Sequence, residues 1–315
     1  MAAVAIAASF CGCNKMEEGV FNPKQKLVEV YQESSDNNGG SWQSRGKELA
    51  EAYTWNGKVL ESIAYVNGTV VETFQYDDKN RISGSTIIEN AFIVSTITTK
   101  YVYDEDELEE INVFENGTLI SSYEFEHEDG KISRIEVNYP DTKSACPKAL
   151  QYADPLRRVM PKQIAENMNR VISMAAAKGN NGIYFDFEWD GKNISAISSA
   201  IEEMTFRVTY KYDNKSNPYS GLFDIYSITS NMVETATPLF SKNNPVEISV
   251  TMTGIFNDSY SVNVNYQYDG KYPISSTMET PVVSYNYQYN EATGEYETVE
   301  TEYQQRTVTT YVYAK

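Results

Sequence analysis

One stretch of alternating residues constrains what this 315-residue chain can fold into more than any other. From Tyr123 to Glu128, aromatic residues and a histidine alternate with glutamates, which is the period of two of a half-buried β-strand. Asp129-Gly130 follows and tolerates the positive φ angles of a tight turn, and Lys131–Ile135 begins a return strand. The stretch predicts a β-hairpin with one aromatic face and one acidic face.

Variants of this hairpin recur along the chain. The first aromatic residues of successive hairpins are Tyr53, Phe74, Tyr101 and Tyr123, which gives spacings of 21, 27 and 22 residues. A period of this length corresponds to two strands plus two turns. Hairpins joined in sequence form an antiparallel meander, so we predict an all-β fold that is strongly twisted and barrel-like. Whether the sheet closes stays open at this stage.

The alternation stops between residues 140 and 182, where a helical pattern replaces it. Pro161 is placed to begin a helix and Lys178-Gly179 to end it. Between them, one helical face collects five apolar residues, namely Ile164, Met168, Val171, Ile172 and Ala175. We predict one helical insertion (about 140–182) within a single β-meander domain that spans residues 25–315.

The N-terminus carries a signature of lipid attachment. Ala2–Phe10 is a short apolar stretch, and a glycine stands directly before Cys13, as at the lipobox cysteine of bacterial lipoproteins. The basic residues that normally precede such a stretch are missing. We predict a signal peptide at residues 1–12, lipidation of Cys13 and a lipidated tether at residues 13–24. A metal or redox pair formed by Cys11 and Cys13, or an uncleaved apolar tail, is the alternative interpretation.

The hairpin motif reads aromatic-x-aromatic-Asp-x-x-Gly/Asn-Lys/Arg-Ile. It is carried by Tyr53-Thr54-Trp55-Asn56-Gly57-Lys58, Phe74-Gln75-Tyr76-Asp77-Asp78-Lys79-Asn80-Arg81-Ile82, Tyr210-Lys211-Tyr212-Asp213-Asn214-Lys215-Ser216-Asn217-Pro218 and Lys242-Asn243-Asn244-Pro245. This pattern resembles the tyrosine–aspartate repeats of large bacterial surface proteins. With the start of the chain, it is similar to Bacteroidota-type lipoproteins built from tyrosine–aspartate-like hairpin repeats. The resemblance implies an all-β lipoprotein of the outer membrane, at the cell surface rather than the periplasmic face, and supplies no catalytic residues.

Charge and hydropathy narrow the range of partners. The formal net charge of −18 argues against nucleic acid or an anionic membrane surface as a partner, because either would repel the chain. No stretch after Cys13 reaches the roughly 20 apolar residues of a membrane-spanning helix. The membrane is therefore expected to be reached through the lipid anchor only. The Tyr123–Glu128 hairpin alone permits a barrel that itself spans the membrane, with the glutamates facing a polar lumen. Such a barrel ranks below the soluble sheet, because other strands, such as Arg207–Tyr212, are short and a lipid anchor would be redundant.

The sequence offers no recognisable catalytic constellation. His127 is the single histidine and shares a strand face with Phe125, so a packed residue is favoured over a catalytic base. No nucleophile elbow, phosphate loop or dinucleotide fingerprint is present. Asp104–Glu110 gathers carboxylates without the spacing of a calcium loop, which favours a solvated turn. We predict a non-enzymatic protein without metal or cofactor, and the alternative is a carboxylate-dependent glycan-processing enzyme.

Exposed aromatic residues are the candidates for ligand contact. Tryptophan and tyrosine faces stack on sugar rings, although the same residues also stabilise sheets through cross-strand pairs. Trp42, in a polar loop, and Trp55 and Trp189, at hairpin ends, are the predicted ligand-binding residues because turns expose them. The predicted function is a binding or structural module whose partner is a glycan or another envelope protein. A purely structural assembly subunit is the third hypothesis.

Overall fold

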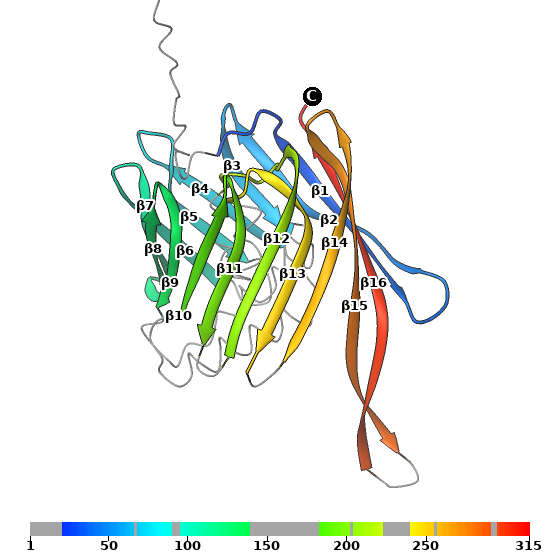
Figure 1. Ribbon diagram of the computed structural model, residues 1–315. Helices are drawn as coiled ribbons and strands as arrows, with labels where there is room; N and C mark the ends of the chain where they lie inside the picture. Colours follow the sequence, from blue (N-terminus) through cyan, green and yellow to red (C-terminus); the bar gives the residue numbers. More distant parts are fainter. Residues whose placement is uncertain are drawn as a thin grey trace, which may run out of the picture.

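The computed structural model is a closed antiparallel β-barrel (Figure 1). It describes residues 21–65, 68–89, 95–138, 183–201, 204–222, 240–254, 257–290 and 295–315. In these ranges the strands are β1 (Leu27–Asn37), β2 (Gln43–Asn56), β3 (Val59–Tyr65), β4 (Val70–Tyr76), β5 (Ile82–Glu89), β6 (Ser95–Asp104), β7 (Glu107–Glu115), β8 (Thr118–Glu128), β9 (Lys131–Asn138), β10 (Ile183–Asp190), β11 (Asn193–Ile201), β12 (Met204–Ser216), β13 (Asn243–Thr253), β14 (Asp258–Asp269), β15 (Tyr272–Asn290) and β16 (Glu295–Tyr313).

Every strand pairs with its neighbours in sequence, and β16 pairs with β1 to close the ring. The closing register runs from Leu27↔Tyr313 to Asn37↔Gln304. The predicted all-β meander is therefore confirmed, and the sheet closes. The predicted helical insertion, the signal peptide and most of the tether, including Cys13, lie outside the described residues.

The two ends of the barrel differ. At one end the even-numbered strands turn into the following odd-numbered strands, as at Asp129-Gly130, whose φ angles of 53° and 68° suit a tight hairpin turn. We call this the aromatic end. At the other end β15 and β16 outrun their neighbours: β15 pairs with β14 only as far as Met278, whereas the β15–β16 pairing continues to Asn290↔Glu295. Figure 1 shows this two-stranded ribbon projecting beyond the barrel, and we call that end the ribbon end.

Apolar side chains point into the barrel and polar side chains point outward. On β12, for example, Phe206 and Val208 are buried while Arg207 and Thr209 are exposed. The buried apolar side chains form one hydrophobic cluster. Among the described residues, the exposed large apolar side chains lie on five different strands and are Ile88, Val102, Leu119, Tyr184 and Ile274. Over the side chains that the structure describes, the outer wall therefore shows no continuous apolar band.

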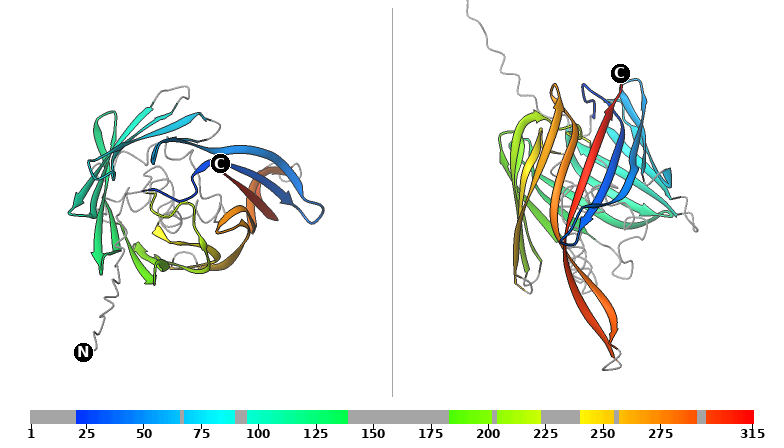
Figure 2. Two further views of the ribbon diagram at one scale, coloured as in Figure 1. Left: turned by 90° about the horizontal axis from the view of Figure 1, so that it is seen from above. Right: turned by 90° about the vertical axis from the view of Figure 1, so that its right-hand side faces the viewer.

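Chain segments also enter the ring at the aromatic end. Figure 2 (left) shows the start of the described chain, in dark blue, and the yellow-green connection after β12 inside the ring. Phe21, Leu222 and Phe240 on these segments are at most 3% exposed. Phe240 meets the ring of Phe187 edge-on, with 6.2 Å between ring centroids. These side chains extend the hydrophobic core into the mouth of the barrel.

A repeated hydrogen bond joins neighbouring strands at the aromatic end. In each case the second residue of an aromatic pair donates to the backbone carbonyl of the first or second residue of the strand before it. The donor, acceptor and distance are Trp55 to Leu27, 2.6 Å; Tyr76 to Leu60, 2.5 Å; Tyr103 to Ile82, 2.8 Å; Trp189 to Ile132, 2.7 Å; Tyr212 to Ile194, 2.6 Å; and Tyr313 to Pro273, 2.8 Å. We call this bond the aromatic lock.

A β-bulge places the second aromatic residue in most of these hairpins. The register shifts directly before Trp55, Tyr76 and Tyr103, and again before Trp189 and Tyr212. A bulge adds a residue to one strand and re-aims the side chains beyond it. The first aromatic residue therefore stays in the core, whereas the second reaches sideways to the preceding strand.

The basic residue of the motif lies over the ring of the aromatic residue that donates the aromatic lock. Lys26 lies 4.4 Å from the ring centroid of Trp55, and Arg81 lies 4.0 Å from that of Tyr103. Each of these basic residues stands immediately before the residue whose carbonyl accepts the hydrogen bond of the aromatic lock. A cation within about 6 Å of an aromatic ring is attracted to its face. The Lys/Arg-Ile pair of the motif thus supplies the cation, the carbonyl acceptor and a buried side chain together.

We expect Tyr103→Phe to lower the free energy of unfolding by about 1 kcal/mol, because it removes one hydrogen bond and keeps the ring under Arg81. Urea denaturation measures the change. Tyr184→Phe is the matched control, because Tyr184 is 37% exposed on the outer wall, and it should change stability by less than about 0.5 kcal/mol. Equal losses in the two variants would contradict a stabilising role for the lock.

The buried tyrosines also predict alkaline instability. Burial raises the pKa of Tyr76, Tyr212 and Tyr313 above the ordinary value of 10.0. Their stabilising effect is complete below pH 10 and is lost as the pH rises, because the unfolded chain then releases protons that the folded chain retains. The free energy of unfolding should therefore fall from about pH 10 upward. Tyrosinate absorbance that rises at pH 10 for every tyrosine, without unfolding, would be the contrary result.

Candidate ligand-binding surface

Two of the three predicted tryptophans are part of the aromatic end. The indole N–H groups of Trp55 and Trp189 donate to the carbonyls of Leu27 and Ile132. Both side chains are half-buried and packed against the hydrophobic core. The structure gives them a clear stabilising role, and ligand contact at these two positions stays a prediction.

Trp42 differs from the other two tryptophans. It lies in the loop directly before β2, as predicted, and its side chain is half-exposed. Its ring is covered by the guanidinium of Arg306, at 4.0 Å from the ring centroid. In the described part of the chain, the indole N–H of Trp42 makes no hydrogen bond to protein. A partly exposed ring with an uncommitted donor is suited to contact a ligand.

The closure of the barrel builds the surroundings of Trp42. Arg306 on β16 is opposite Glu279 on β15 and donates to it from Nε at 2.8 Å. Thr307, the next residue on β16, is buried, so Arg306 points to the outer wall. We call Trp42, Arg306 and Glu279 the Trp42 patch. It combines a flat apolar ring with a cation and a carboxylate, which are groups that can contact the rings and hydroxyls of a sugar.

On the other face of the same strands, polar and charged residues hold β1 to its neighbours. Arg45 on β2 donates to Asp36 on β1 at 2.7 Å, and this hydrogen bond raises the pKa of Arg45. Gln305 on β16 also donates to Asp36, at 3.4 Å. These contacts fix the geometry of the corner from which the ribbon extends. Sequence reasoning missed Arg306 and Glu279, because only barrel closure brings them to a loop near the start of the chain.

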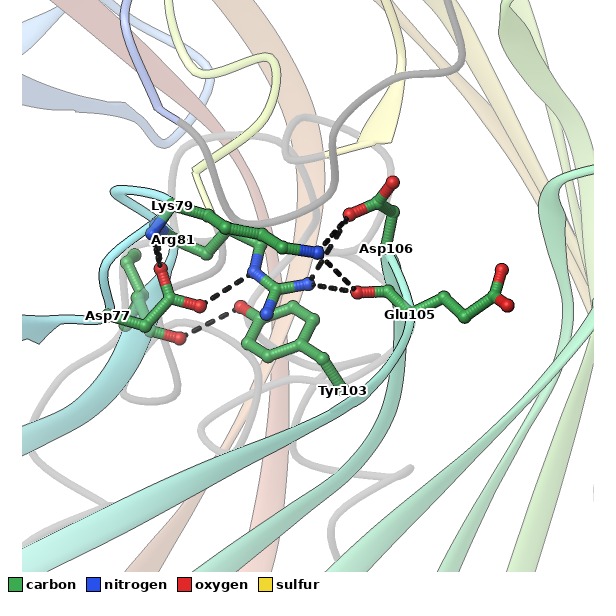
Figure 3. Close-up of polar contacts among 7 residues, drawn as sticks. Asp77, Lys79, Arg81, Tyr103, Glu105 and Asp106 are labelled. Atoms are coloured by element: carbon green, nitrogen blue, oxygen red, sulfur yellow. Dashed lines mark hydrogen bonds and ion pairs between the residues drawn. The ribbon is translucent and has the colours of Figure 1, made fainter.

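The acidic turn of the β6–β7 hairpin binds two basic residues of the β4–β5 hairpin beside it. Figure 3 shows that Lys79 and Arg81, on the turn before β5, reach toward this turn. Lys79 Nζ lies 2.8 Å from a carboxylate oxygen of Asp106, and Arg81 donates to the carbonyl of Glu105 at 2.7 Å. Arg81 also pairs with Asp77 at 2.7 Å, and the pKa of this carboxyl is lowered because hydrogen bonds from Arg81 outweigh its desolvation. The carboxylates here connect two hairpins.

No metal centre emerges from this turn or elsewhere in the described ranges. There, no group of three His, Cys, Asp or Glu side chains is arranged to hold an ion. His127 is half-buried and follows a β-bulge opposite Ile132, the register position that the second aromatic residue occupies in other hairpins. Its place in the sheet is that of a packed strand residue.

Two inward carboxylates were not singled out from the sequence. Glu51 and Glu72 are 3% and 0% exposed, on β2 and β4. Tyr53 donates to Glu51 at 2.7 Å, and Tyr65 donates to Glu72 at 3.5 Å. The signal was available, because each glutamate stands two positions before an inward aromatic residue, Tyr53 or Phe74, and therefore shares its strand face. Their burial keeps a polysaccharide away from them in this structure, so they do not form the open cleft that glycoside hydrolysis needs.

No protein-family model matches the chain, and no curated protein matches it significantly. A porin-like protein from Bacteroides uniformis has a similar structure, with 10% identity and a TM-score of 0.46, over 94% of this chain and 100% of that one. A porin-like protein from Bacteroides vulgatus has 11% identity and a TM-score of 0.33, over 92% and 99%.

A third similar structure is the Tc holotoxin pore of Photorhabdus luminescens, with 11% identity and a TM-score of 0.25, over 76% of this chain and 12% of that one. All three TM-scores lie below 0.5. None of the helical segments in the described ranges is long and apolar enough to span a membrane.

Two tryptophan substitutions separate the roles of these residues. Trp189→Phe removes the donor to Ile132 and should lower the free energy of unfolding by at least about 1 kcal/mol. Trp42→Phe keeps a ring under Arg306 and should change it by less than about 0.5 kcal/mol. Urea denaturation of the two proteins measures both values. A loss for Trp42→Phe as large as that for Trp189→Phe would make Trp42 a structural residue.

Proposed function

We propose that this protein is a non-enzymatic lipoprotein, held at the outer membrane through Cys13 and facing the cell surface. Its barrel stands outside the hydrocarbon layer and acts as a binding module for a glycan or another envelope protein. The observation that carries this proposal is the polarity of the barrel, which is apolar inside and polar outside.

A barrel that spans a membrane needs the opposite arrangement. Its outer wall carries an apolar band about 25 Å tall, and a lysine or arginine at the middle of that band costs about 2–4 kcal/mol. Here the outer wall of β12 presents Arg207 and Lys211. Arg207 reaches across β11 to pair with Glu188 on β10, and Lys211 pairs with Glu247 on the adjacent strand β13. Charged pairs of this kind are stable in water and unfavourable in hydrocarbon. An anchor other than the strands is therefore required for a place at the membrane.

Cys13 provides that anchor in the proposal. It precedes Phe21, the first described residue, by eight positions, so a lipidated Cys13 would join the barrel to the membrane through a short tether. No catalytic constellation was found in the sequence, and the buried carboxylates Glu51 and Glu72 are closed to a polymer substrate. A binding role therefore fits the described residues better than glycan processing.

The Trp42 patch is the proposed place of ligand contact. It lies on the outer wall toward the ribbon end, where Trp42 keeps its indole N–H uncommitted in the described structure. Polysaccharides and envelope proteins are the ligands to screen. Trp42→Ala should lose the binding that such a screen detects, whereas Tyr184→Ala, on the outer wall of β10, should retain it. Binding that survives Trp42→Ala would move the site elsewhere.

The anchor is tested with adjacent cysteines. We expect Cys13→Ala to release the protein from the membrane fraction, because it removes the atom that carries the lipid. Cys11→Ala is the matched control and should stay in the membrane fraction, since Cys11 is removed with the signal peptide. Mass spectrometry of the mature N-terminus should find an acylated Cys13. An unmodified Cys13, or release by Cys11→Ala alone, would contradict the proposal, and added protease on intact cells tests the surface location.

A further inference from the structure

Basic residues gather on one sector of the aromatic end. The sector comprises residues 21–26, 56–59, 190–193, 213–222, 240–243, 269–272 and 314–315, at the ends of β1, β2 and β10 to β16. Its lysines are Lys24, Lys26, Lys58, Lys192, Lys215, Lys242, Lys271 and Lys315, and its acidic residues are Asp190, Asp213 and Asp269. Eight lysines against three aspartates give this lysine sector a formal charge of +5, within a chain whose formal charge is −18.

The rest of the aromatic end has the reverse balance. Turn residues 77–81, 104–107 and 128–131 hold three basic and eight acidic residues. Two of the three basic residues form ion pairs within that region, as Lys79 pairs with Asp106 and Arg81 with Asp77. The aromatic end is therefore divided into a positive part, which is the lysine sector, and a negative part formed by the three acidic turns.

Backbone hydrogen bonds show that the lysine sector is continuous. Lys242 donates its N–H to the carbonyl of Lys192 at 3.1 Å, and Ser216 donates to the carbonyl of Lys271 at 2.9 Å. Ala314 donates to the carbonyl of Lys26 at 2.9 Å. Turns from distant parts of the sequence are thus held side by side, and their lysines share one surface.

Most of these lysines have no acidic partner. Lys24, Lys58, Lys192, Lys242 and Lys271 are exposed, and in the described part of the chain none of them forms an ion pair. Uncompensated lysines on one surface attract an anionic partner, and the attraction acts within a Debye length of about 8 Å at physiological salt.

The N-terminal tether leaves from the same sector. Phe21 stacks on Trp55, with 5.6 Å between ring centroids. Cys13 precedes Phe21 by eight residues, and a chain of that length spans at most about 29 Å when fully extended. A lipid on Cys13 therefore keeps the lysine sector within that distance of the membrane. The tether segment before Phe21 adds Lys15, Glu17 and Glu18, which together carry a formal charge of −1. The tether and the lysine sector together therefore stay positive.

We propose that the lysine sector docks on an anionic lipid surface, so that the aromatic end faces the membrane and the ribbon end points away. The net charge of the whole chain argues against such a surface as a partner, but it averages over a molecule whose charges are segregated. The docked orientation rests on the Cys13 anchor proposed above, whereas the affinity of the sector for lipid does not. An experiment can therefore contradict the Cys13 anchor without contradicting the affinity of the lysine sector for lipid, and the reverse.

The test uses the full chain with Cys13→Ser, which removes the anchor. Binding is measured by sedimentation with vesicles of phosphatidylglycerol and phosphatidylcholine in equal parts, and with phosphatidylcholine alone. Each lysine near an anionic surface contributes about fivefold in affinity, so K58Q/K192Q/K271Q should bind the mixed vesicles about 100-fold more weakly. K47Q/K100Q/K211Q, on the barrel wall, makes the same change of net charge and should bind like the parent.

Equal losses in the two triple variants would overturn the proposal, because only net charge would then matter. No binding by the Cys13→Ser chain, or equal binding to phosphatidylcholine alone, would also overturn it, and an acidic protein would become the expected partner. If a triple variant fails to fold, energy transfer to dansyl-labelled lipid decides. In the Trp42→Phe chain, the tryptophan fluorescence comes only from Trp55 and Trp189 at the aromatic end. When this chain binds vesicles, energy transfer from these two tryptophans to the dansyl-labelled lipid should be strong. Weak transfer would contradict the docked orientation.

Discussion

The barrel depends on the hydrogen bond from the second aromatic residue of a hairpin to the carbonyl of the preceding strand. That carbonyl lies at the end of a strand, where ladder bonds run out, and an unpaired buried carbonyl is costly. Tyr103 and Trp189 satisfy such carbonyls while their rings pack on the core. Because the same bond recurs from Trp55 to Tyr313, six strand pairs are fastened by it at one end of the closed sheet.

The direction of burial decides what this barrel can do. A sheet of this size has two faces and must place its apolar face away from water. In this chain the apolar face points inward, and Phe21, Leu222 and Phe240 extend the core into one mouth. The outer wall is left polar and charged, and this polarity is the observation behind the proposed lipid anchor and the proposed binding role.

Much of this architecture was predictable from local pattern, because strand alternation and turn chemistry act over a few residues. Asp129-Gly130 predicted its turn, and Phe206-Arg207-Val208 shows the alternation that the structure keeps. The candidate site was predictable only in part. Trp42 was found as an exposed loop residue, but Arg306 and Glu279 stand more than 230 positions later, and no local signal places them beside it. The acidic turn was identified as structural, yet its partners Lys79 and Arg81 emerged only from packing.

Residue type and spacing alone were enough to predict the fold class and the hairpin period, and they are also the whole basis of the anchor predicted at Cys13, which stays a prediction. The tertiary structure decided three things that depend on distance between remote segments. It closed the sheet by pairing β1 with β16, it turned the second aromatic residues into locks, and it collected lysines from seven separate segments on one sector. Alternation tells which residues share a face, but only closure tells which face is inside and which ends of the strands meet.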